Sequence, residues 1–114
     1  MPQGGEFLTQ TERTVLSPSA TQLAASRGVS CSEACSRSGL KCAAELLQFV
    51  NACDALSTLF KCEGGCGHQV GKDIPCYVAD ATRNTARQCL ISDGSEPLTC
   101  TAKHPSTQRA CVCV

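Results

Sequence analysis

Eleven cysteines constrain the folding of this 114-residue chain more than any other feature of its sequence. They all lie between Cys31 and Cys113 and make up roughly a tenth of the chain, the level typical of disulfide scaffolds in secreted proteins. The chain has one tyrosine, three phenylalanines and no tryptophan, so few large apolar groups are available for a core. A poor core combined with dense cysteines is typical of small domains in oxidising compartments. We therefore predict a protein of the secretory pathway, in its lumen or outside the cell.

All eleven cysteines are candidate half-cystines. Their number is odd, so one thiol is expected to pair with another chain or to stay free. Among the rest, disulfides replace the missing core as the main source of stability. The predicted disulfide cysteines are Cys31, Cys35, Cys42, Cys53, Cys62, Cys66, Cys76, Cys89, Cys100, Cys111 and Cys113.

Charge and hydropathy exclude two classes of partner. The ten basic and ten acidic residues cancel, which argues against binding to nucleic acid or to an anionic membrane surface. No stretch is apolar enough to span a bilayer, so we expect no membrane insertion, and residues 1–30 hold no apolar run of signal-peptide length. A cysteine-rich composition typical of lumenal proteins, without a signal peptide, suggests a piece of a longer secreted or membrane-anchored protein, or an incomplete gene prediction.

The segment from Cys31 to Cys42 contains a predicted short helix. Ser30 is a candidate N-cap with Glu33 completing a capping box, and Gly39 stands where a glycine ends such a helix. Cys31 and Cys35 then share one helix face. Because a two-turn helix is unstable alone in water, we expect disulfides to hold it.

The sequence predicts a small, disulfide-rich α+β domain over residues 29–114, with short helices in its first half and short strands or a hairpin in its second. Residues 1–28 are rich in Ser, Thr and Gln, so they are predicted to be a flexible lead-in or linker outside the domain, with at most a turn of helix at Thr21–Ser26. Two short helices or one broken helix are expected between Ala43 and Phe60, restarting at Asp54 as an N-cap.

The second half reads as a loop followed by short strands. Residues 62–71 hold four glycines and predict a loop, residues 76–78 an extended stretch, and residues 79–88 an irregular one. Residues 89–92 and 98–101 predict a hairpin around Asp93-Gly94, and residues 110–114 a closing strand. On that strand Cys111 and Cys113 face the same way, so we expect each to reach a different cysteine of the opening segment.

Metal binding and catalysis have weak support. Zinc ligands are conceivable in two groups, but their CxxxC and CxC spacings match no standard zinc module, so we predict neither a metal nor a cofactor. Catalysis would need a thiolate beside a base, whereas these cysteines are expected to be oxidised, and the candidate carboxylates lie in polar stretches typical of solvated charge. The zinc candidates are Cys62, Cys66 and His68, or His104, Cys111 and Cys113, and the carboxylates are Asp73, Asp80 and Asp93.

Sugar or peptide binding is the third possibility. Tyr77 is the one obvious aromatic platform, although a core position beside Cys76 explains it equally well. A possible contact loop spans residues 104–109 and offers His104, Gln108 and Arg109. The alternative, which we favour, is a structural turn in which Arg109 donates to backbone carbonyls.

The opening CSEACSRSGLKC and the closing CTAKHPSTQRACVC together resemble one family, the alpha-1,6-mannosylglycoprotein 6-beta-N-acetylglucosaminyltransferases of the Golgi, in their cysteine-rich C-terminal region. The similarity covers roughly residues 29–114 and includes the Cys31, Cys35 and Cys42 spacing, the closing His104-Pro105 and Gln108-Arg109 pairs, and Cys111-x-Cys113. Cys53, Cys66 and Cys76 are extra to the family pattern, and we expect Cys53 to pair with Cys66 or Cys76. The family's catalytic region would lie upstream and is missing, so no catalytic residue carries over.

Three hypotheses follow. The resemblance implies a non-catalytic accessory domain or fragment of a Golgi glycosyltransferase, packing on its catalytic domain. The missing catalytic region favours a free-standing extracellular module that contacts a glycoprotein or another extracellular protein. A zinc-binding domain is favoured only by the absence of a signal peptide.

Overall fold

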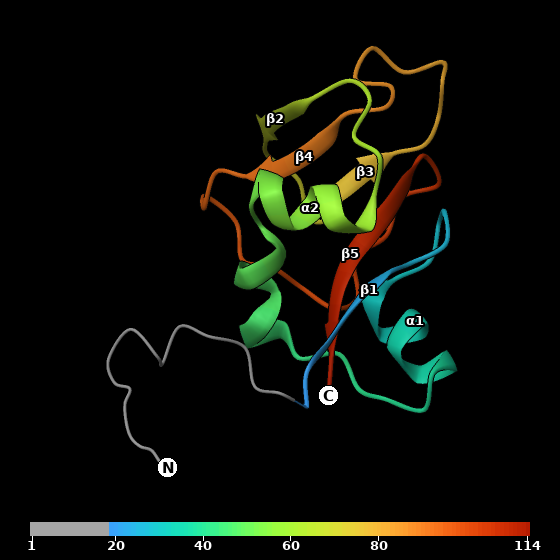
Figure 1. The fold of residues 1–114 in the computed structure, drawn as a ribbon, viewed down its shortest axis with the longest axis vertical. Coiled ribbons are helices and arrows are strands. Elements are labelled where there is room, and N and C mark those ends of the chain that lie inside the picture. The colour runs from blue at the N-terminus through green and yellow to red at the C-terminus, as the bar shows by residue number, and fades with distance from the viewer. Residues whose placement is uncertain (1–18) are drawn as a thin grey trace.

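A five-stranded sheet organises the computed structural model, which describes residues 19–114 (Figure 1). The strand order across the sheet is β1-β5-β3-β4-β2, so the last strand in the sequence lies inside the sheet. All neighbouring strands are antiparallel except β2 and β4, which are parallel. The strands are β1 (Thr21–Ala24), β2 (Cys66–Gln69), β3 (Cys76–Val78), β4 (Cys89–Ser92) and β5 (Thr107–Cys113).

Strand β5 is the central support of the sheet. It pairs with β1 along one edge and with β3 along the start of the other, where Cys76 lies opposite Arg109. The segment around Cys42 continues that second edge, because Lys41 and Val114 exchange both backbone hydrogen bonds. Every residue of β5 except Gln108 is buried, so elements cover both of its faces.

Helix α1 (Cys31–Arg37) forms as its end signals predict. The Ser30 side chain accepts from the Glu33 N–H while the Glu33 carboxylate accepts from the Ser30 N–H, a complete capping box. At the other end Gly39 has φ +73°, and the N–H of Leu40 donates to the Cys35 carbonyl, which closes a Schellman motif. The predicted helix is confirmed at both ends.

Two further helices occupy the predicted 43–60 region. A 3₁₀ helix, η2 (Ala44–Val50), is followed by α2 (Cys53–Leu59), so the broken-helix expectation is confirmed. The predicted cap is wrong, because Ala52 is the N-cap and Asp54 lies inside the first turn. Between the helices, the Asn51 side chain donates to the carbonyl of Ser92 and accepts from its N–H, which ties the helices to β4.

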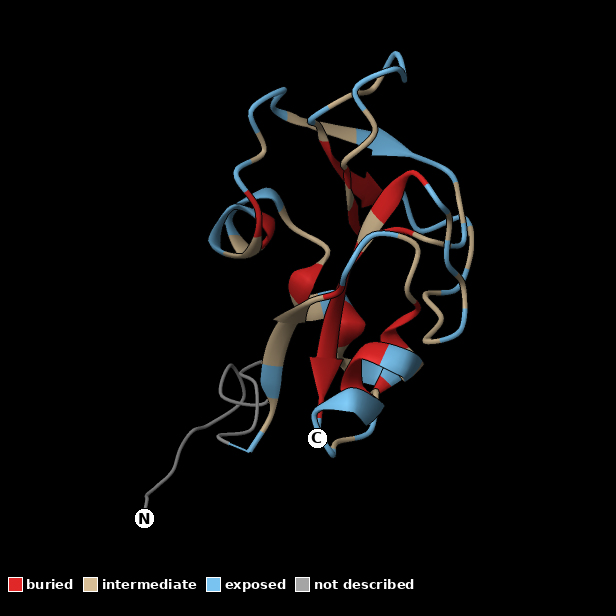
Figure 2. Cartoon of the chain, turned by 90° about the vertical axis from the view of Figure 1, so that its right-hand side faces the viewer, coloured by how far each residue is buried: buried red, intermediate tan, exposed pale blue. Residues whose placement is uncertain are grey.

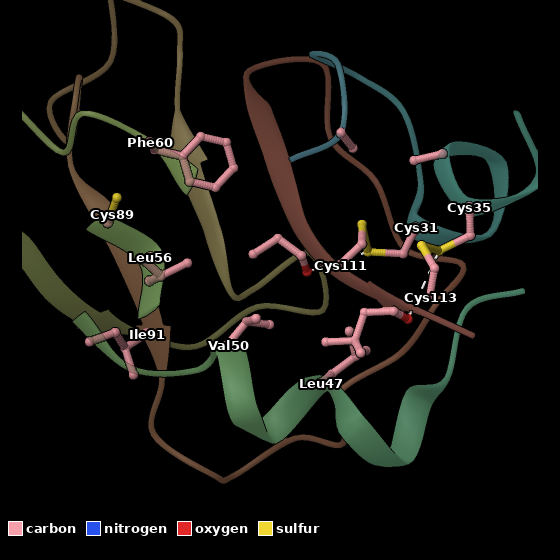
Figure 3. Packing of buried hydrophobic residues seen from close by; sticks show 14 residues of the cluster. Cys31, Cys35, Leu47, Val50, Leu56, Phe60, Cys89, Ile91, Cys111 and Cys113 are labelled. Atoms are coloured by element: carbon pink, nitrogen blue, oxygen red, sulfur yellow. Dashed lines mark hydrogen bonds between the residues drawn. A yellow bond between two sulfur atoms is a disulfide. The ribbon is translucent and has the colours of Figure 1, made fainter. Parts of the chain in front are cut away.

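The core lies between the sheet and these helices (Figure 2). Leu47, Val50 and Leu56 are fully buried against the sheet, and Phe60 is nearly so. In Figure 3, Leu47 and Val50 lie on one side of β5, and the cystines of Cys111 and Cys113 lie on the side of α1. Buried cystines therefore fill part of the core that large aromatic side chains, which are few in this chain, would otherwise occupy.

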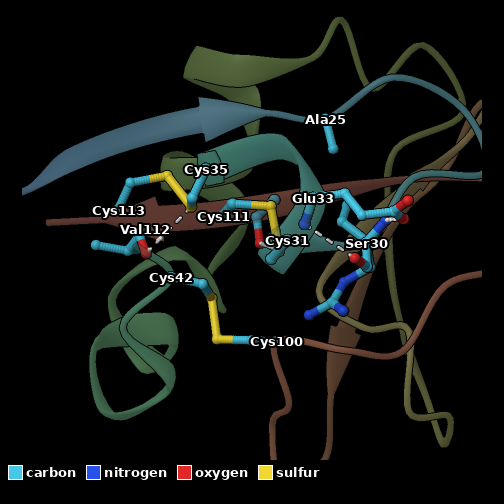
Figure 4. The surroundings of a disulfide bond; sticks show 12 residues. Ala25, Ser30, Cys31, Glu33, Cys35, Cys42, Cys100, Cys111, Val112 and Cys113 are labelled. Atoms are coloured by element: carbon cyan, nitrogen blue, oxygen red, sulfur yellow. Dashed lines mark hydrogen bonds between the residues drawn. A yellow bond between two sulfur atoms is a disulfide. The ribbon is translucent and has the colours of Figure 1, made fainter. Parts of the chain in front are cut away.

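Five disulfides cross-link the fold. Two of them join α1 to β5, and a third joins the segment after α1 to the segment before β5; Figure 4 shows these three. The fourth joins α2 to β2, and the fifth joins the loop after α2 to β4. They are Cys31–Cys111, Cys35–Cys113, Cys42–Cys100, Cys53–Cys66 and Cys62–Cys89. Both cysteines of the closing strand thus reach the opening segment, and Cys53 pairs with one of its two expected partners.

Three further expectations about the strands and loops are wrong. Thr21–Ala24 is a strand and not a helical turn, so the domain begins before residue 29; residues 1–18 of the expected lead-in lie outside the described part. Residues 66–69 of the expected loop form β2. Residues 98–101 form no strand, because Ser32 and Arg109 bond the carbonyls of this segment and Cys42 bonds Cys100. The chain does bend at Asp93-Gly94, where Gly94 has φ +89°, but the residues after the bend do not pair with β4, whose neighbours are β2 and β3.

We predict that β1 contributes measurably to stability. A chain beginning at Gly28 should melt at least about 5 °C below one beginning at Ser19, because it loses the β1–β5 pairing and the bond from the Ala25 N–H to the Arg109 carbonyl. Thermal unfolding followed by circular dichroism on oxidised protein tests this. Equal midpoints would show that β1 lies on the sheet without stabilising it.

Candidate binding pocket

The candidate site lies where the chain turns into β5. In this turn the N–H of Ser106 donates to Nδ1 of His104 over 3.0 Å, and the N–H of Thr107 donates to the His104 carbonyl over 3.1 Å. Ser106 and Thr107 are buried, whereas His104 is half-buried. The turn therefore fixes the imidazole at one wall of an adjoining pocket.

Two hydroxyl–carboxylate bonds brace this turn against the loops before and after β3. Ser106 Oγ donates to Asp80 over 3.0 Å, and Thr107 Oγ1 donates to Asp73 Oδ2 over 2.9 Å. The Thr82 hydroxyl and N–H, followed by the Ser106 hydroxyl, lower the pKa of Asp80 to about 2. Asp80 is therefore ionised at neutral pH, and its Oδ2 also lies 3.5 Å from the Arg27 guanidinium. These bonds hold the pocket walls in one arrangement.

The pocket is small, with an apolar floor and polar walls. Its volume is about 270 Å³. Ile74, Val78 and Leu90 form the floor and belong to a second buried cluster, separate from the main core. The walls carry Asp73, Arg83, Asn84, His104, Ser106 and Thr107. A mixed lining of this kind binds ligands with a polar head and a short apolar part.

Two charged groups of the walls form no close ion pair within the described part of the chain, although Asp73 is within electrostatic range of the buried Arg109 guanidinium. Neither Asp73 nor Arg83 forms an ion pair with any residue between 19 and 114, although both line the same pocket. Asp73 is half-buried and Arg83 is exposed. The sequence predicts Asp73 as a solvated surface charge and carries no motif that marks Arg83, since the two residues line one pocket only in the folded chain.

One of the predicted half-cystines, Cys76, is a buried free thiol under the pocket floor. Burial, followed by the charge of Asp73, raises its pKa to about 12, and Arg109 opposes this only in part. The thiolate needed for nucleophilic catalysis is therefore almost absent at neutral pH. The prediction of a disulfide at Cys76 is wrong because α2 brings Cys53 to Cys66 instead.

Of the three residues predicted to form a contact loop, only His104 lines the pocket. Arg109 is fully buried within β5, where its guanidinium donates to the carbonyls of Ala102 and Thr99 over 2.7 and 2.8 Å, so the alternative structural interpretation is confirmed. Gln108 also lies on β5 and donates to the Ala25 carbonyl. Both residues hold neighbouring segments in place and are unavailable to a partner.

The other sequence candidates do not assemble into sites. Cys62, Cys66, Cys111 and Cys113 are all in disulfides and cannot ligate zinc, and residues 19–114 contain no group of three potential metal ligands. Tyr77 stacks on Phe60 with 5.4 Å between ring centroids, and its hydroxyl donates to Glu63. The Asp93 carboxylate accepts from the N–H and the hydroxyl of Ser95, and His68 lies exposed on β2.

Comparisons with protein families and with curated proteins found no match to this chain. Within the described part of the chain, no helix has the length and apolar character needed to cross a bilayer. Five disulfides fit an oxidising environment of the secretory pathway or the cell exterior.

We predict one thiol per oxidised chain, reactive only after unfolding. With a pKa of about 12, only roughly one Cys76 in ten thousand is ionised at pH 8. A thiol reagent such as DTNB should therefore give almost no signal with native protein at pH 8 and one equivalent in guanidinium. A Cys76→Ala variant should give none in either state. More than one equivalent from the wild type would contradict the five-disulfide framework.

Proposed function

We propose that this chain is a binding module of the secretory lumen or extracellular space, and that it acts through non-covalent contact at the pocket beside His104. The observation that carries this proposal is the pocket itself, which presents unpaired donors and acceptors over an apolar floor. Its walls are braced by the Asp73 and Asp80 bonds and rest on a disulfide-linked sheet. Such preorganisation lowers the entropic cost of binding.

The finer proposal is a relation to the C-terminal region of the Golgi N-acetylglucosaminyltransferases that build the β1,6 branch of N-glycans. Its support is the arrangement of the two segments that carry the resemblance. Three disulfides join the opening segment 31–42 to the closing segment 100–113, so the two form one structural unit. A catalytic domain of that family is then the proposed partner, and a glycoprotein or other extracellular protein is the partner if the module stands alone.

The chain by itself should not transfer N-acetylglucosamine. A sugar nucleotide needs a larger cleft than about 270 Å³ and a positioned base for the acceptor hydroxyl. Oxidised protein incubated with UDP-N-acetylglucosamine and a biantennary N-glycan should yield no product above background by mass spectrometry. Turnover that scales with protein concentration would refute the non-catalytic assignment.

Small ligands should bind at the pocket and be blocked by a bulky wall residue. Nuclear magnetic resonance of ¹⁵N-labelled chain, titrated with single amino acids and monosaccharides, should shift the amides of Asp73, Arg83 and His104. An Asn84→Trp variant should lose this response, because residue 84 lines the pocket and is exposed enough to change without unfolding the protein.

The matched control is Ser36→Trp on the exposed face of α1, which should keep the full response. If neither ligand class shifts these amides in the wild type, the pocket is not a binding site and the proposed function fails.

A further inference from the structure

The two unpaired charges of the pocket point to a ligand class. We propose that the pocket binds the zwitterionic head of a small aliphatic α-amino acid, with its ammonium at Asp73, its carboxylate at Arg83 and His104, and its side chain over the apolar floor. This inference rests on the proposed function, since it identifies the ligand of the same pocket.

The ammonium position follows from the hydrogen bonds of Asp73. Oδ2 accepts from Thr107, whereas Oδ1 accepts from no residue between 19 and 114. A Cβ at position 71 would lie 3.2 Å from Oδ1, so the glycine there keeps the approach to this oxygen open. The Thr107 hydroxyl is 2.9 Å from Oδ2 and 3.4 Å from the His104 carbonyl oxygen, so its hydrogen is directed at acceptors of the protein itself. Oδ1 of Asp73 is therefore a charged acceptor without a hydrogen-bond donor in the described part of the chain, which suits an ammonium group.

The carboxylate position follows from two donors that line the pocket, Arg83 and His104. Arg27 is engaged with Asp80 and Arg87 with Glu63, but Arg83 has no acidic partner among the described residues. Nδ1 of His104 accepts from the Ser106 N–H, so in the neutral ring the hydrogen is on Nε2, which can donate. A guanidinium and an N–H donor that line one pocket can both donate to a carboxylate, the guanidinium with charge-assisted hydrogen bonds.

The size and floor of the pocket restrict the ligand further. A volume of about 270 Å³ lies below the roughly 300–1,000 Å³ of pockets for drug-sized ligands. Ile74, Val78 and Leu90 give a short aliphatic side chain apolar contact, and there is no space for a nucleotide. A neutral sugar would leave both charges without partners, and the aromatic Tyr77 that could stack on its ring is engaged with Phe60.

The first experiment compares three ligands on oxidised wild-type chain by ¹⁵N nuclear magnetic resonance titration. L-Valine carries both charges, N-acetyl-L-valine lacks the ammonium, and L-valinamide lacks the carboxylate. Because each lost charge removes a charge-assisted hydrogen bond, each blocked form should bind at least about tenfold more weakly than valine. This comparison needs no variant and so does not depend on any variant folding.

The second experiment assigns each charge to its residue. Asp73→Asn should bind valine and N-acetylvaline equally, because Asn keeps an acceptor for Thr107 and loses only the charge. Arg83→Gln should bind valine and valinamide equally. The matched controls Asp54→Asn on α2 and Arg37→Gln on α1 are exposed and outside the pocket, so both should keep the full tenfold preferences.

The outcomes separate the two proposals. Equal affinity of the wild type for valine and both derivatives would overturn the zwitterion assignment, as would saturation of the pocket amides by glucose and not by valine. In either case the pocket is still a binding site, and the proposed function stands. Loss of preference in the Asp54 or Arg37 control would also overturn the assignment, because the effect would then not come from the pocket.

Discussion

The fold depends on the pair of disulfides that fastens α1 to β5. Cys31 and Cys35 lie one helical turn apart, Cys111 and Cys113 lie two strand positions apart, and both pairs point at each other. A single bridge would leave the helix free to rotate about it, but two bridges fix its orientation as well. In the chain-entropy model, closing a loop of about 80 residues is worth roughly 4–5 kcal/mol for the first bridge. A seven-residue helix could not hold this position by its own propensity.

Strand β5, which these two disulfides hold, also connects to the pocket. β5 begins at Thr107, which holds Asp73, and the residue before it holds Asp80. Farther along, the buried Arg109 guanidinium donates to the carbonyls of Thr99 and Ala102, and no carboxylate of the described residues accepts a hydrogen bond from it, although Asp73 is within electrostatic range. Replacing it would leave those carbonyls unpaired in the interior, which is costly. Arg109 thus stabilises the segment that leads into the pocket turn, although it does not line the pocket.

Local signals in the sequence predicted the parts of the fold that local interactions determine. The capping box of α1, the break between η2 and α2, and the strand at Cys111–Cys113 depend on residues within a few positions of one another. The strand at Thr21 was missed because its four residues resemble a linker until β5 supplies their partners. The hairpin at 98–101 was wrongly predicted because Arg109 and Cys42 compete for that segment. The pocket was not predicted, since its charges come from segments that carry no motif.

The sequence separation of the disulfides also determines the order in which the protein can mature during synthesis. Every native partner of the opening segment is Cys100 or a later cysteine, so this segment enters an oxidising lumen with no correct cysteine available. Meanwhile Cys53 and Cys66, only 13 residues apart, can pair as soon as they emerge. Cys31, Cys35 and Cys42 are therefore open to premature bonding with one another. Any bond formed among these three cysteines must be exchanged before α1 can be linked to β5.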